Sequence, residues 1–348
     1  MGNRYAPATV LAFVMTKLIY IDDSLPGITR KRAGKGWAYY SPEGALITDR
    51  AEKKRLNAVA LPPAYVDAWY CPAPNGHILA TGIDAKGRKQ YRYHPEFRAA
   101  RESEKFDSCV TFGKLLPLVR KRVEDDLRGH KLTRERVIAS VIRLLDLGAV
   151  RVGNEGYAER NKSFGATTLR QRHADVTGKT LSLRYKGKSG KMREVTLTDG
   201  SLARIVRKMQ DLPGQNVFQY LDDDGEVRSV GSSDVNEYLE DTMGERFTAK
   251  NFRTWHASVL AFKALWEGEA CMPIKDLLDC VATKLGNTPA VTRKSYIHPA
   301  VFDLVERQEE WRDSMNLPRS TRWHSREERG LIALLEGSPH SADLLEAA

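Results

Sequence analysis

The chain is poor in cysteine for its 348 residues and lacks the spacings that bind zinc. Its four cysteines, Cys71, Cys109, Cys271 and Cys280, form no CxxC pair and no Cys/His set with metal-ligand spacing. A chain of this length also buries enough apolar surface to fold without disulfides. We therefore expect no zinc site and no disulfide framework, which fits a reducing cytoplasm.

Long apolar segments are missing as well. Residues 6–15, APATVLAFVM, resemble a signal peptide only faintly, because the run is short and Lys17 soon follows it. No later stretch has the roughly 20 apolar residues that a membrane-spanning helix needs. The sequence predicts a cytoplasmic protein without a membrane partner.

The signatures of several enzyme classes are absent. Gly187-Lys188-Ser189 is not a phosphate-binding loop, because Ser182 stands where that loop requires its first glycine. Neither HExxH nor GxSxG occurs. The acidic run Asp222 to Asp224 precedes Gly225, as is typical of a turn, and no second acidic group has a matching spacing. We expect no nucleotide site, no metal and no cofactor.

Positive charge, by contrast, is abundant. Lys and Arg number 55 against 45 Asp and Glu, which gives a net charge of +10 and a pI near 9.3. Such a chain attracts polyanions at neutral pH, so nucleic acid is the first candidate partner. The length exceeds that of one small core and predicts two folding units.

The first of these units is predicted to be rich in β-structure. Short aromatic or β-branched runs, separated by Gly and Pro, are typical of strands and occupy residues 37–40, 70–71, 77–81 and 90–93. The best hairpin signal is the turn at residues 84–87, between candidate strands 77–82 and 88–93. Residues 29–37 carry four cations beside a glycine-rich turn, and we expect them to form a solvated loop.

The second strand of this hairpin carries groups suited to DNA on both faces. Alternation separates two sets, Arg88, Gln90 and Arg92 on one face and Lys89, Tyr91 and Tyr93 on the other. Guanidinium groups bind phosphate or guanine, an amide binds adenine, and phenols bind sugars and phosphates. We predict DNA contacts by Arg88, Gln90, Tyr91, Arg92 and Tyr93. An ordinary solvated hairpin explains the same pattern, so both interpretations stay open.

Helical periodicity dominates after residue 95. Residues 134–147 have a continuous apolar face behind an N-cap threonine and end at a glycine, and residues 253–266 and 273–285 have similar patterns. Residues 167–199 interrupt the helices with short strands and Gly-Lys turns. The predicted fold class is α+β: a small β-rich N-terminal domain, then a larger, mainly helical domain with a small antiparallel sheet.

A series of polar residues along the helical domain resembles the type IB DNA topoisomerases, in the small form shared by poxviruses and some bacteria. The series consists of Arg151-Val-Gly-Asn154, Lys188 in a hairpin turn, Lys250-Asn-Phe-Arg253-Thr-Trp, and Asn287 nine residues before Tyr296. The hairpin at residues 82–95 also resembles the DNA-gripping domain of that form. The resemblance covers about residues 20 to 325. It implies the topoisomerase and tyrosine recombinase catalytic fold.

The resemblance also implies a role for each residue of the series. Tyr296 would be the nucleophile, Arg151 and Arg253 would stabilise the transition state, Lys188 would be the general acid, Asn287 would hydrogen-bond the phosphate, and Lys250 would contact DNA. A monomer encircling double-stranded DNA would relax positive and negative supercoils through a 3′-phosphotyrosyl intermediate, without ATP. We expect it in the cytoplasm, associated with the nucleoid.

The implied domains are a tail (1–19), a β-rich DNA-clamping domain (20–97), a helical catalytic domain (98–325) and a charged C-terminal tail (326–348), for which a final helix is the alternative. The implied chemistry agrees with simple electrostatics. A phosphodiester is already anionic and its transition state gains charge, so fixed cations are needed. A phenol with an ordinary pKa of about 10 also needs cations to ionise at neutral pH.

Two features depart from the family pattern. Asn287 stands where many members carry histidine, and an amide donates a hydrogen bond but carries no charge and passes no proton. The connection from Arg253 to Asn287 is short, which predicts a trimmed loop.

Two alternatives remain open. A tyrosine recombinase uses the same nucleophile but usually shows His-x-x-Arg, whereas this chain has Lys250-x-x-Arg253. A non-catalytic DNA-binding protein would hold duplex through its basic faces and would tolerate the loss of Tyr296. Taken singly, Arg151, Lys188 and Tyr296 each have an ordinary structural explanation, and only their joint order supports catalysis.

Overall fold

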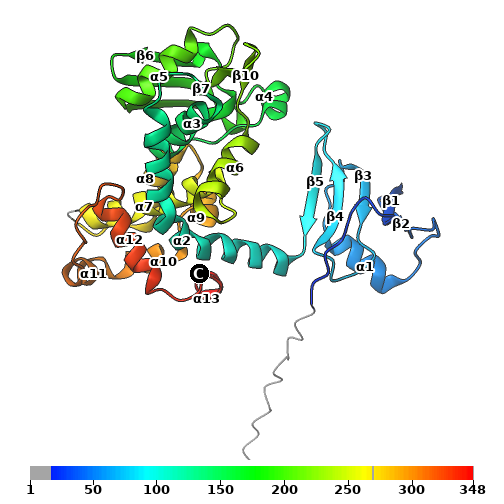
Figure 1. Cartoon of the computed structure of the whole chain (residues 1–348). Coiled ribbons are helices and arrows are strands. Elements are labelled where there is room, and N and C mark those ends of the chain that lie inside the picture. The colour runs from blue at the N-terminus through cyan, green and yellow to red at the C-terminus, as the bar shows by residue number, and fades with distance from the viewer. Residues whose placement is uncertain (1–16, 269, 348) are drawn as a thin grey trace, which may run out of the picture. The chain divides into compact units, whose positions relative to one another are not determined.

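The computed structural model describes residues 17–268 and 270–347 (Figure 1). The faint signal-peptide resemblance at residues 6–15 and most of the expected N-terminal tail, residues 1–19, lie outside this part. Within the described residues, no helix is both long enough and apolar enough to cross a membrane.

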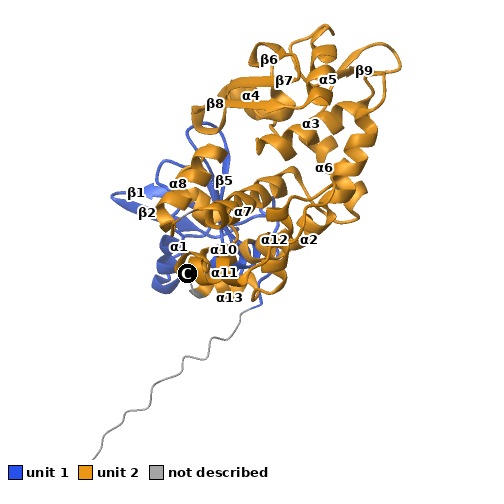
Figure 2. Ribbon diagram, turned by 90° about the vertical axis from the view of Figure 1, so that its left-hand side faces the viewer, with its two compact units in different colours: residues 1–101 blue, residues 102–348 orange. Residues whose placement is uncertain are grey.

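The chain divides into two compact units, the first ending at Arg101 and the second beginning at Glu102 (Figure 2). The boundary falls inside one long helix, α2 (Pro95–Leu127). The first unit is built on an antiparallel sheet, and the second is mainly helical with two small antiparallel sheets. The predicted α+β class is therefore confirmed.

The described part of the first unit contains a five-stranded antiparallel sheet, the helix α1 (Arg50–Ala58) and the first residues of α2. The strands are β1 (Ile28–Ala33), β2 (Gly36–Tyr40), β3 (Val66–Tyr70), β4 (Ile78–Ile83) and β5 (Lys89–Tyr93), in the order β2-β1-β3-β4-β5. A small core of buried residues includes Ile28, Tyr39, Leu56, Tyr70 and Ala80.

Residues 29–37 are not the loop that their charge suggests, because most of them form β1 and its turn into β2. The guanidinium of Arg30 donates to the carbonyl oxygens of Leu61 (2.9 Å) and Pro62 (2.6 Å). It also lies 4.0 Å from the ring centroid of Trp37. A cation that binds carbonyls and an aromatic ring is held inside the domain, so its charge does not require a loop.

The β4–β5 hairpin forms where its turn residues place it. Gly87 has φ +70°, a left-handed conformation that glycine adopts without strain, and its N–H donates to the Asp84 carbonyl at 2.9 Å. Thr81 pairs with Tyr91 and Gly82 with Gln90 across the two strands. The predicted hairpin is therefore confirmed.

The second unit contains most of the helices. After α2 they are α3 (Arg134–Gly148), α4 (Glu155–Asn161), α5 (Gly200–Gln210), α6 (Ser232–Met243), α7 (Ala249–Glu267), α8 (Ile274–Leu285), α9 (Pro289–Ser295), α10 (Pro299–Phe302), α11 (Gln308–Ser314), α12 (Arg326–Glu336) and α13 (Ser341–Ala347). The three periodic segments of the sequence are α3, α7 and α8, so those helix predictions are confirmed. Helix α7 begins four residues before the expected position, at Ala249.

The predicted β interruption forms a three-stranded sheet in the order β6-β7-β8. The strands are β6 (Ala174–Thr177), β7 (Thr180–Lys186) and β8 (Met192–Thr198). A further two-stranded hairpin, β9 (Gln219–Leu221) and β10 (Val227–Ser229), encloses the acidic turn and was not predicted.

Close packing between α2 and α7 helps to define the helical core. Trp255 of α7 is fully buried, and a Cβ atom added at Gly113 of α2 would lie 2.3 Å from its ring. Only glycine lets the two helices approach at this point. Helix α3 is buried along most of its length, including Val137, Ile138 and Leu145.

Residues 326–348 are not a solvated charged tail in the part that the structure describes. They form α12 and α13, and α12 begins with a capping box in which Ser325 and Glu328 bond reciprocally. Leu331 is fully buried, and Glu328 is only 6% exposed. The final helix that the sequence left open is therefore present, and the charge pattern suggested a tail because it does not reveal that Glu328 has a buried cationic partner.

Candidate active site

The loop after α3 positions Arg151. Ala149 has φ +48° at the helix end, and the Arg151 carbonyl accepts the N–H of Ala166 at 2.8 Å. Gly165 lies so close that a Cβ there would be 2.6 Å from the Arg151 carbonyl oxygen. The backbone that carries Arg151 is thus held by the segment at residues 165–168.

Arg253 lies in the first half of α7 and is only 3% exposed. Its guanidinium donates to the carbonyl oxygens of Ala149 and Leu285, the latter at 3.1 Å. These carbonyls belong to the ends of α3 and α8, where backbone oxygens lack helical partners. Arg253 therefore joins three helices at one point.

Asn287 reaches the same point because of how α8 ends. The N–H of Asn287 donates to the Ala282 carbonyl (2.9 Å) and that of Gly286 to the Thr283 carbonyl (3.2 Å), with Gly286 at φ +64°. This pair of bonds is a Schellman motif. It turns the chain sharply and directs the Asn287 side chain towards the arginines.

The Asn287 amide links the two arginines. Its Oδ1 accepts a hydrogen bond from Arg151 at 2.5 Å and another from Arg253 at 3.3 Å. Its Nδ2 is buried and has no hydrogen-bond partner among the described residues. Buried amide donors are rarely left unpaired, so this one is a functional candidate.

Tyr296 follows α9, which begins with Thr288 as N-cap and Pro289 at the first helical position. The backbone leaves the helix at Tyr296, with φ −132° and ψ −42°. The phenol is half-buried, and the guanidinium carbon of Arg253 lies 5.0 Å from its ring centroid. Four of the predicted site residues, Arg151, Arg253, Asn287 and Tyr296, therefore lie together.

Electrostatics favour ionisation of this phenol. Burial alone would raise the pKa of Tyr296, but the charges of Arg253 and Arg151, a hydrogen bond from Arg253 and the charge of Lys188 together lower it. Burial and the charge of Arg151 lower the pKa of Arg253 to about 10, so this guanidinium still carries its charge at neutral pH.

Lys188 lies on an exposed turn between β7 and β8. Its charge is one of those that lower the pKa of Tyr296, although within the described part of the chain it makes no hydrogen bond to the other four residues. A lysine on such a turn is free to approach a bound substrate. The structure brings it to the edge of the site and not into its centre.

Two neighbours of the site, Arg193 and Tyr185, were missed by the sequence reasoning. Tyr185 of β7 pairs with Arg193 of β8. Tyr185 lies on the buried face of β7, together with Leu181 and Leu183. Arg193 donates to the Lys284 carbonyl at 3.0 Å, and its charge contributes to the lowered pKa of Arg253. A cation at an inward position of an alternating strand was the signal that could have identified it.

The predicted DNA-contacting residues of the β4–β5 hairpin belong to the first unit. Arg88 and Gln90 both donate to the Asp84 carboxylate, at 2.8 and 3.0 Å. Tyr91 and Tyr93 stack with ring centroids 5.7 Å apart and are both exposed.

Arg92 and Lys250 are the two remaining residues predicted to contact DNA. Arg92 of the first unit donates to the Ala60 carbonyl at 3.1 Å. Lys250 is exposed in the first turn of α7, in the second unit. A cation at that end of the helix is not needed for helix stability, which leaves it available for a ligand.

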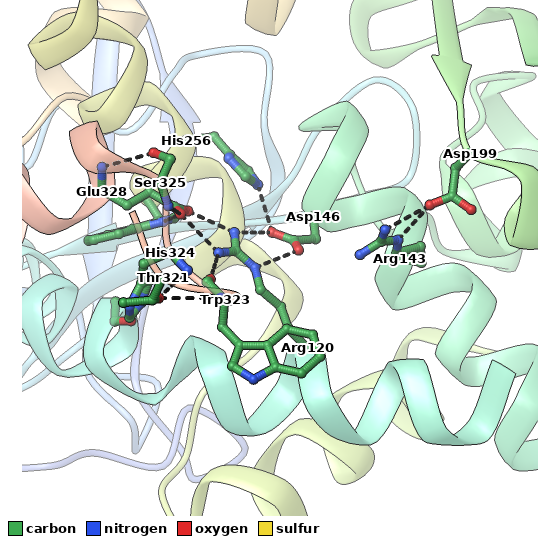
Figure 3. Close-up of polar contacts among 12 residues, drawn as sticks. Arg120, Arg143, Asp146, Asp199, His256, Thr321, Trp323, His324, Ser325 and Glu328 are labelled. Atoms are coloured by element: carbon green, nitrogen blue, oxygen red, sulfur yellow. Dashed lines mark hydrogen bonds and ion pairs between the residues drawn. The ribbon is translucent and has the colours of Figure 1, made fainter. Parts of the chain in front are cut away.

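A buried ionic network around Arg120, Asp146 and Glu328 contacts helix α7 (Figure 3). Arg120 of α2 forms paired hydrogen bonds with Asp146 of α3, both 2.9 Å, and with Glu328 of α12, at 2.7 and 2.9 Å. The indole N–H of Trp255 donates to Glu328 at 3.1 Å. The ion pairs of this network therefore join α2, α3 and α12, and the indole of Trp255 adds α7.

Comparison with known proteins identifies both parts of the chain. The family described as eukaryotic DNA topoisomerase I, catalytic core, matches residues 94–315, and the family described as bacterial DNA topoisomerase IB, N-terminal domain, matches residues 36–84. The DNA topoisomerase 1B of Acanthamoeba polyphaga mimivirus is 31% identical over 301 residues, which cover 82% of this chain and 90% of the relative.

More distant relatives carry similar names. The DNA topoisomerase 1B of Vaccinia virus (strain Copenhagen) is 20% identical over 241 residues, covering 66% of this chain and 73% of the relative. The DNA topoisomerase 1 of Mycosarcoma maydis is 28% identical over 201 residues, which cover 51% of this chain and 19% of that relative. A solved post-cleavage complex of the XerH site-specific recombinase aligns at 16% identity and a TM-score of 0.37, covering 56% of this chain and 51% of that one.

The family match over residues 94–315 spans more than half of the chain, and the mimivirus relative is similar along nearly its whole length. The resemblance predicted from the order of Arg151, Lys188, Arg253 and Tyr296 is thus confirmed at the level of the family. The chain belongs to the type IB DNA topoisomerase family, whose members are isomerases.

Proposed function

We propose that this chain relaxes positively and negatively supercoiled DNA by cutting and resealing one strand, with Tyr296 as the nucleophile. The observation that carries the proposal is the joint placement of Arg151, Arg253 and Asn287 beside a phenol whose pKa is lowered. A structural tyrosine does not need two guanidinium groups and an unpaired amide donor around it. A site that stabilises an anion while it gains charge does need such donors.

The proposed reaction has two chemically similar halves. The Tyr296 oxygen attacks phosphorus, a bond from tyrosine to the 3′ phosphate forms, and the bond to the 5′ oxygen of the next nucleotide breaks. Lys188 gives a proton to that leaving oxygen. After the strand has rotated, the 5′ hydroxyl attacks the phosphotyrosine and restores the backbone. One phosphodiester replaces another, so the cycle needs no ATP.

Arg151, Arg253 and Asn287 stabilise the pentacoordinate phosphorus in this proposal. The Asn287 oxygen now lies where two guanidinium groups converge. A nonbridging phosphate oxygen would take over these donors, and the unpaired Nδ2 of Asn287 would supply another. Loss of one such donor typically costs about a hundredfold to a thousandfold in rate.

The β4–β5 hairpin and Lys250 would bind the duplex. The stacked, exposed rings of Tyr91 and Tyr93 suit contacts with sugar and phosphate, and the net charge of +10 favours a polyanion. We propose a monomer that encircles double-stranded DNA and works in the cytoplasm at the nucleoid.

The test is relaxation of supercoiled plasmid in EDTA without ATP, by the native chain and by Tyr296→Phe. We expect the native chain to relax DNA of both signs and to leave a detergent-trapped protein on a 3′ end. Tyr296→Phe should bind plasmid equally and do neither. Binding without relaxation by the native chain would show a DNA-binding protein instead, and recombinant products from paired sites would show a recombinase.

A further inference from the structure

Lys105 contacts the backbone next to Tyr296, although 190 residues separate Lys105 from its partner. Its Nζ donates to the carbonyl oxygen of Ser295 at 3.2 Å and lies 3.8 Å from the ring centroid of Phe106. Phe106 is buried, so α2 holds the lysine against the core. Neither the sequence series nor the proposed chemistry uses this residue.

The bonded carbonyl is part of the peptide unit that carries Tyr296. Ser295 is the last residue of α9, and its carbonyl has no partner within the helix. The N–H of the same peptide, which belongs to Tyr296, donates to the Thr292 carbonyl at 3.1 Å. Both polar groups of the peptide are thus held, and a cation at a helix C-terminus is also electrostatically favourable.

The chain just after Tyr296 is held as well. The N–H of His298 donates to the Ser258 hydroxyl at 2.9 Å, and this hydroxyl lies 3.5 Å from the Tyr296 carbonyl oxygen. The Nδ1 of His298 accepts from Ala300, and its Nε2 lies 3.3 Å from the Ser341 hydroxyl. On the N-terminal side of the tyrosine, Lys105 is therefore the side chain that holds the peptide, together with the Thr292 carbonyl.

The charge of Lys105 is linked to that of the phenol. Burial lowers the pKa of Lys105, whereas Glu102, the Tyr296 phenolate and Cys109 raise it. Interaction between two titrating groups is mutual, so Lys105 favours the ionised form of Tyr296. The charges of Arg253 and Arg151 lower the pKa of that phenol most, and the charge of Lys188 lowers it less.

We propose that Lys105 is a positioning residue for the nucleophile: it fixes the peptide between Ser295 and Tyr296 and thereby the direction of the phenol towards Arg253. This inference rests on the proposed function, which makes Tyr296 the nucleophile. An error of about 1 Å in a reacting group can cost roughly a hundredfold in rate. A residue that only orients the phenol therefore has a measurable kinetic effect.

The kinetic test compares Lys105→Met, which keeps the length but loses the donor, with Lys105→Arg, which keeps donor and charge. Lys121→Met is the matched control, since Lys121 is exposed on the same helix. With protein in excess over supercoiled plasmid, we expect Lys105→Met to form the trapped adduct 10- to 100-fold more slowly. Its DNA affinity should match that of Lys121→Met, and Lys105→Arg should recover most of the rate.

A second measurement is independent of catalysis. The ionisation of Tyr296 is followed by NMR of tyrosine labelled with ¹³C at Cζ, with Tyr296→Phe identifying the signal among the 13 tyrosines. Lys105→Met should raise the pKa of this phenol, and Lys121→Met should leave it unchanged. An unchanged titration, or an unchanged adduct rate, in Lys105→Met overturns the inference. Failure of the native chain to form an adduct would instead refute the proposed function on which the inference rests, and the titration would then show separately whether Lys105 acts on the Tyr296 phenol.

Discussion

At the scale of single residues, the site is defined by where hydrogen-bond donors remain free. Arg253 donates hydrogen bonds to the backbone carbonyls of Ala149 and Leu285, and Arg151 donates one to Asn287. Asn287 thus acts as a neutral acceptor between two cations and keeps them apart without cancelling their charge. A carboxylate in its place would have the same shape and the opposite effect.

Asn287→Asp tests this role. The new carboxylate would pair with Arg151 and Arg253, which stabilises the folded state but repels phosphate. We expect a melting temperature equal to or above that of the native chain and a cleavage rate lower by about a hundredfold or more. Asn287→Ser is the control, because it removes the linking amide without adding charge. A native cleavage rate in Asn287→Asp would exclude phosphate contact at this position.

At the scale of elements, the ends of helices position the chemistry. The Schellman turn after α8 directs Asn287, the left-handed Ala149 after α3 leads to Arg151, and the C-terminus of α9 presents Tyr296. Gly286 is the most constrained of these positions, because a Cβ there would lie 2.2 Å from Nη1 of Arg193.

Gly286→Ala should therefore damage both stability and the site. The matched control is Gly244→Ala, at the end of α6, where φ is +70° but no atom lies within 4 Å of an added Cβ. Left-handed strain alone predicts a loss of about 1 kcal/mol in the free energy of unfolding for Gly244→Ala. Gly286→Ala should lose more in urea titrations and should also slow cleavage, since Arg193 and Asn287 must move. Equal losses and equal cleavage rates in the two variants would contradict this account.

The amino-acid sequence predicts many of these helices and strands, because their patterns depend on residues that are neighbours in the sequence. Helical spacing identified α3, α7 and α8, and the turn residues identified the β4–β5 hairpin, because both depend on neighbours in sequence. The β1 strand was missed because Arg30 is held by carbonyls of residues 61 and 62, which no local pattern reveals. Arg193 and Lys105 were missed for the same reason.

At the scale of the whole chain, charges far apart in the sequence hold the second unit together. Arg120 bonds with Asp146 and with Glu328, 208 residues away, and Glu328 also accepts from Trp255 of the helix that carries Arg253. Burial alone would raise the pKa of Glu328, but the hydrogen bonds and charge of Arg120 lower it to about 2. The ionised carboxylate thus stabilises the folded state.

Glu328→Gln measures this contribution and its dependence on pH. The pKa of Glu328 falls from its ordinary value of 4.5 to about 2 on folding, so its stabilisation is complete above pH 4.5 and is lost as the pH falls towards 2. At pH 7 we expect Glu328→Gln to lower the free energy of unfolding by about 3 kcal/mol, because a carboxylate oxygen that accepts from Arg120 becomes a buried amide donor and Arg120 keeps only Asp146 as an anionic partner. The deficit should shrink between pH 4.5 and 2.

The control for this measurement is Glu336→Gln on the same helix. Glu336 pairs with Lys114 at 2.5 Å, but both side chains are about half exposed, at 49% and 51%. Exposed pairs contribute about 0 to 1 kcal/mol. A deficit for Glu328→Gln that is no larger than this, or one that does not change in acid, would show that the buried network is not stabilising.

The sequence alone determined the fold class, the main helices and the order in which Arg151, Lys188, Arg253, Asn287 and Tyr296 follow one another, because composition, periodicity and motif order are written along the chain. Only the tertiary structure decided that Asn287 links two arginines, that Lys105 holds the peptide before Tyr296, and that residues 326–347 form packed helices and not a tail. These features depend on burial and on partners 30 to 200 residues away. Such partners meet only when the helices pack. Packing also buries the charged groups, and burial strengthens the interactions between them.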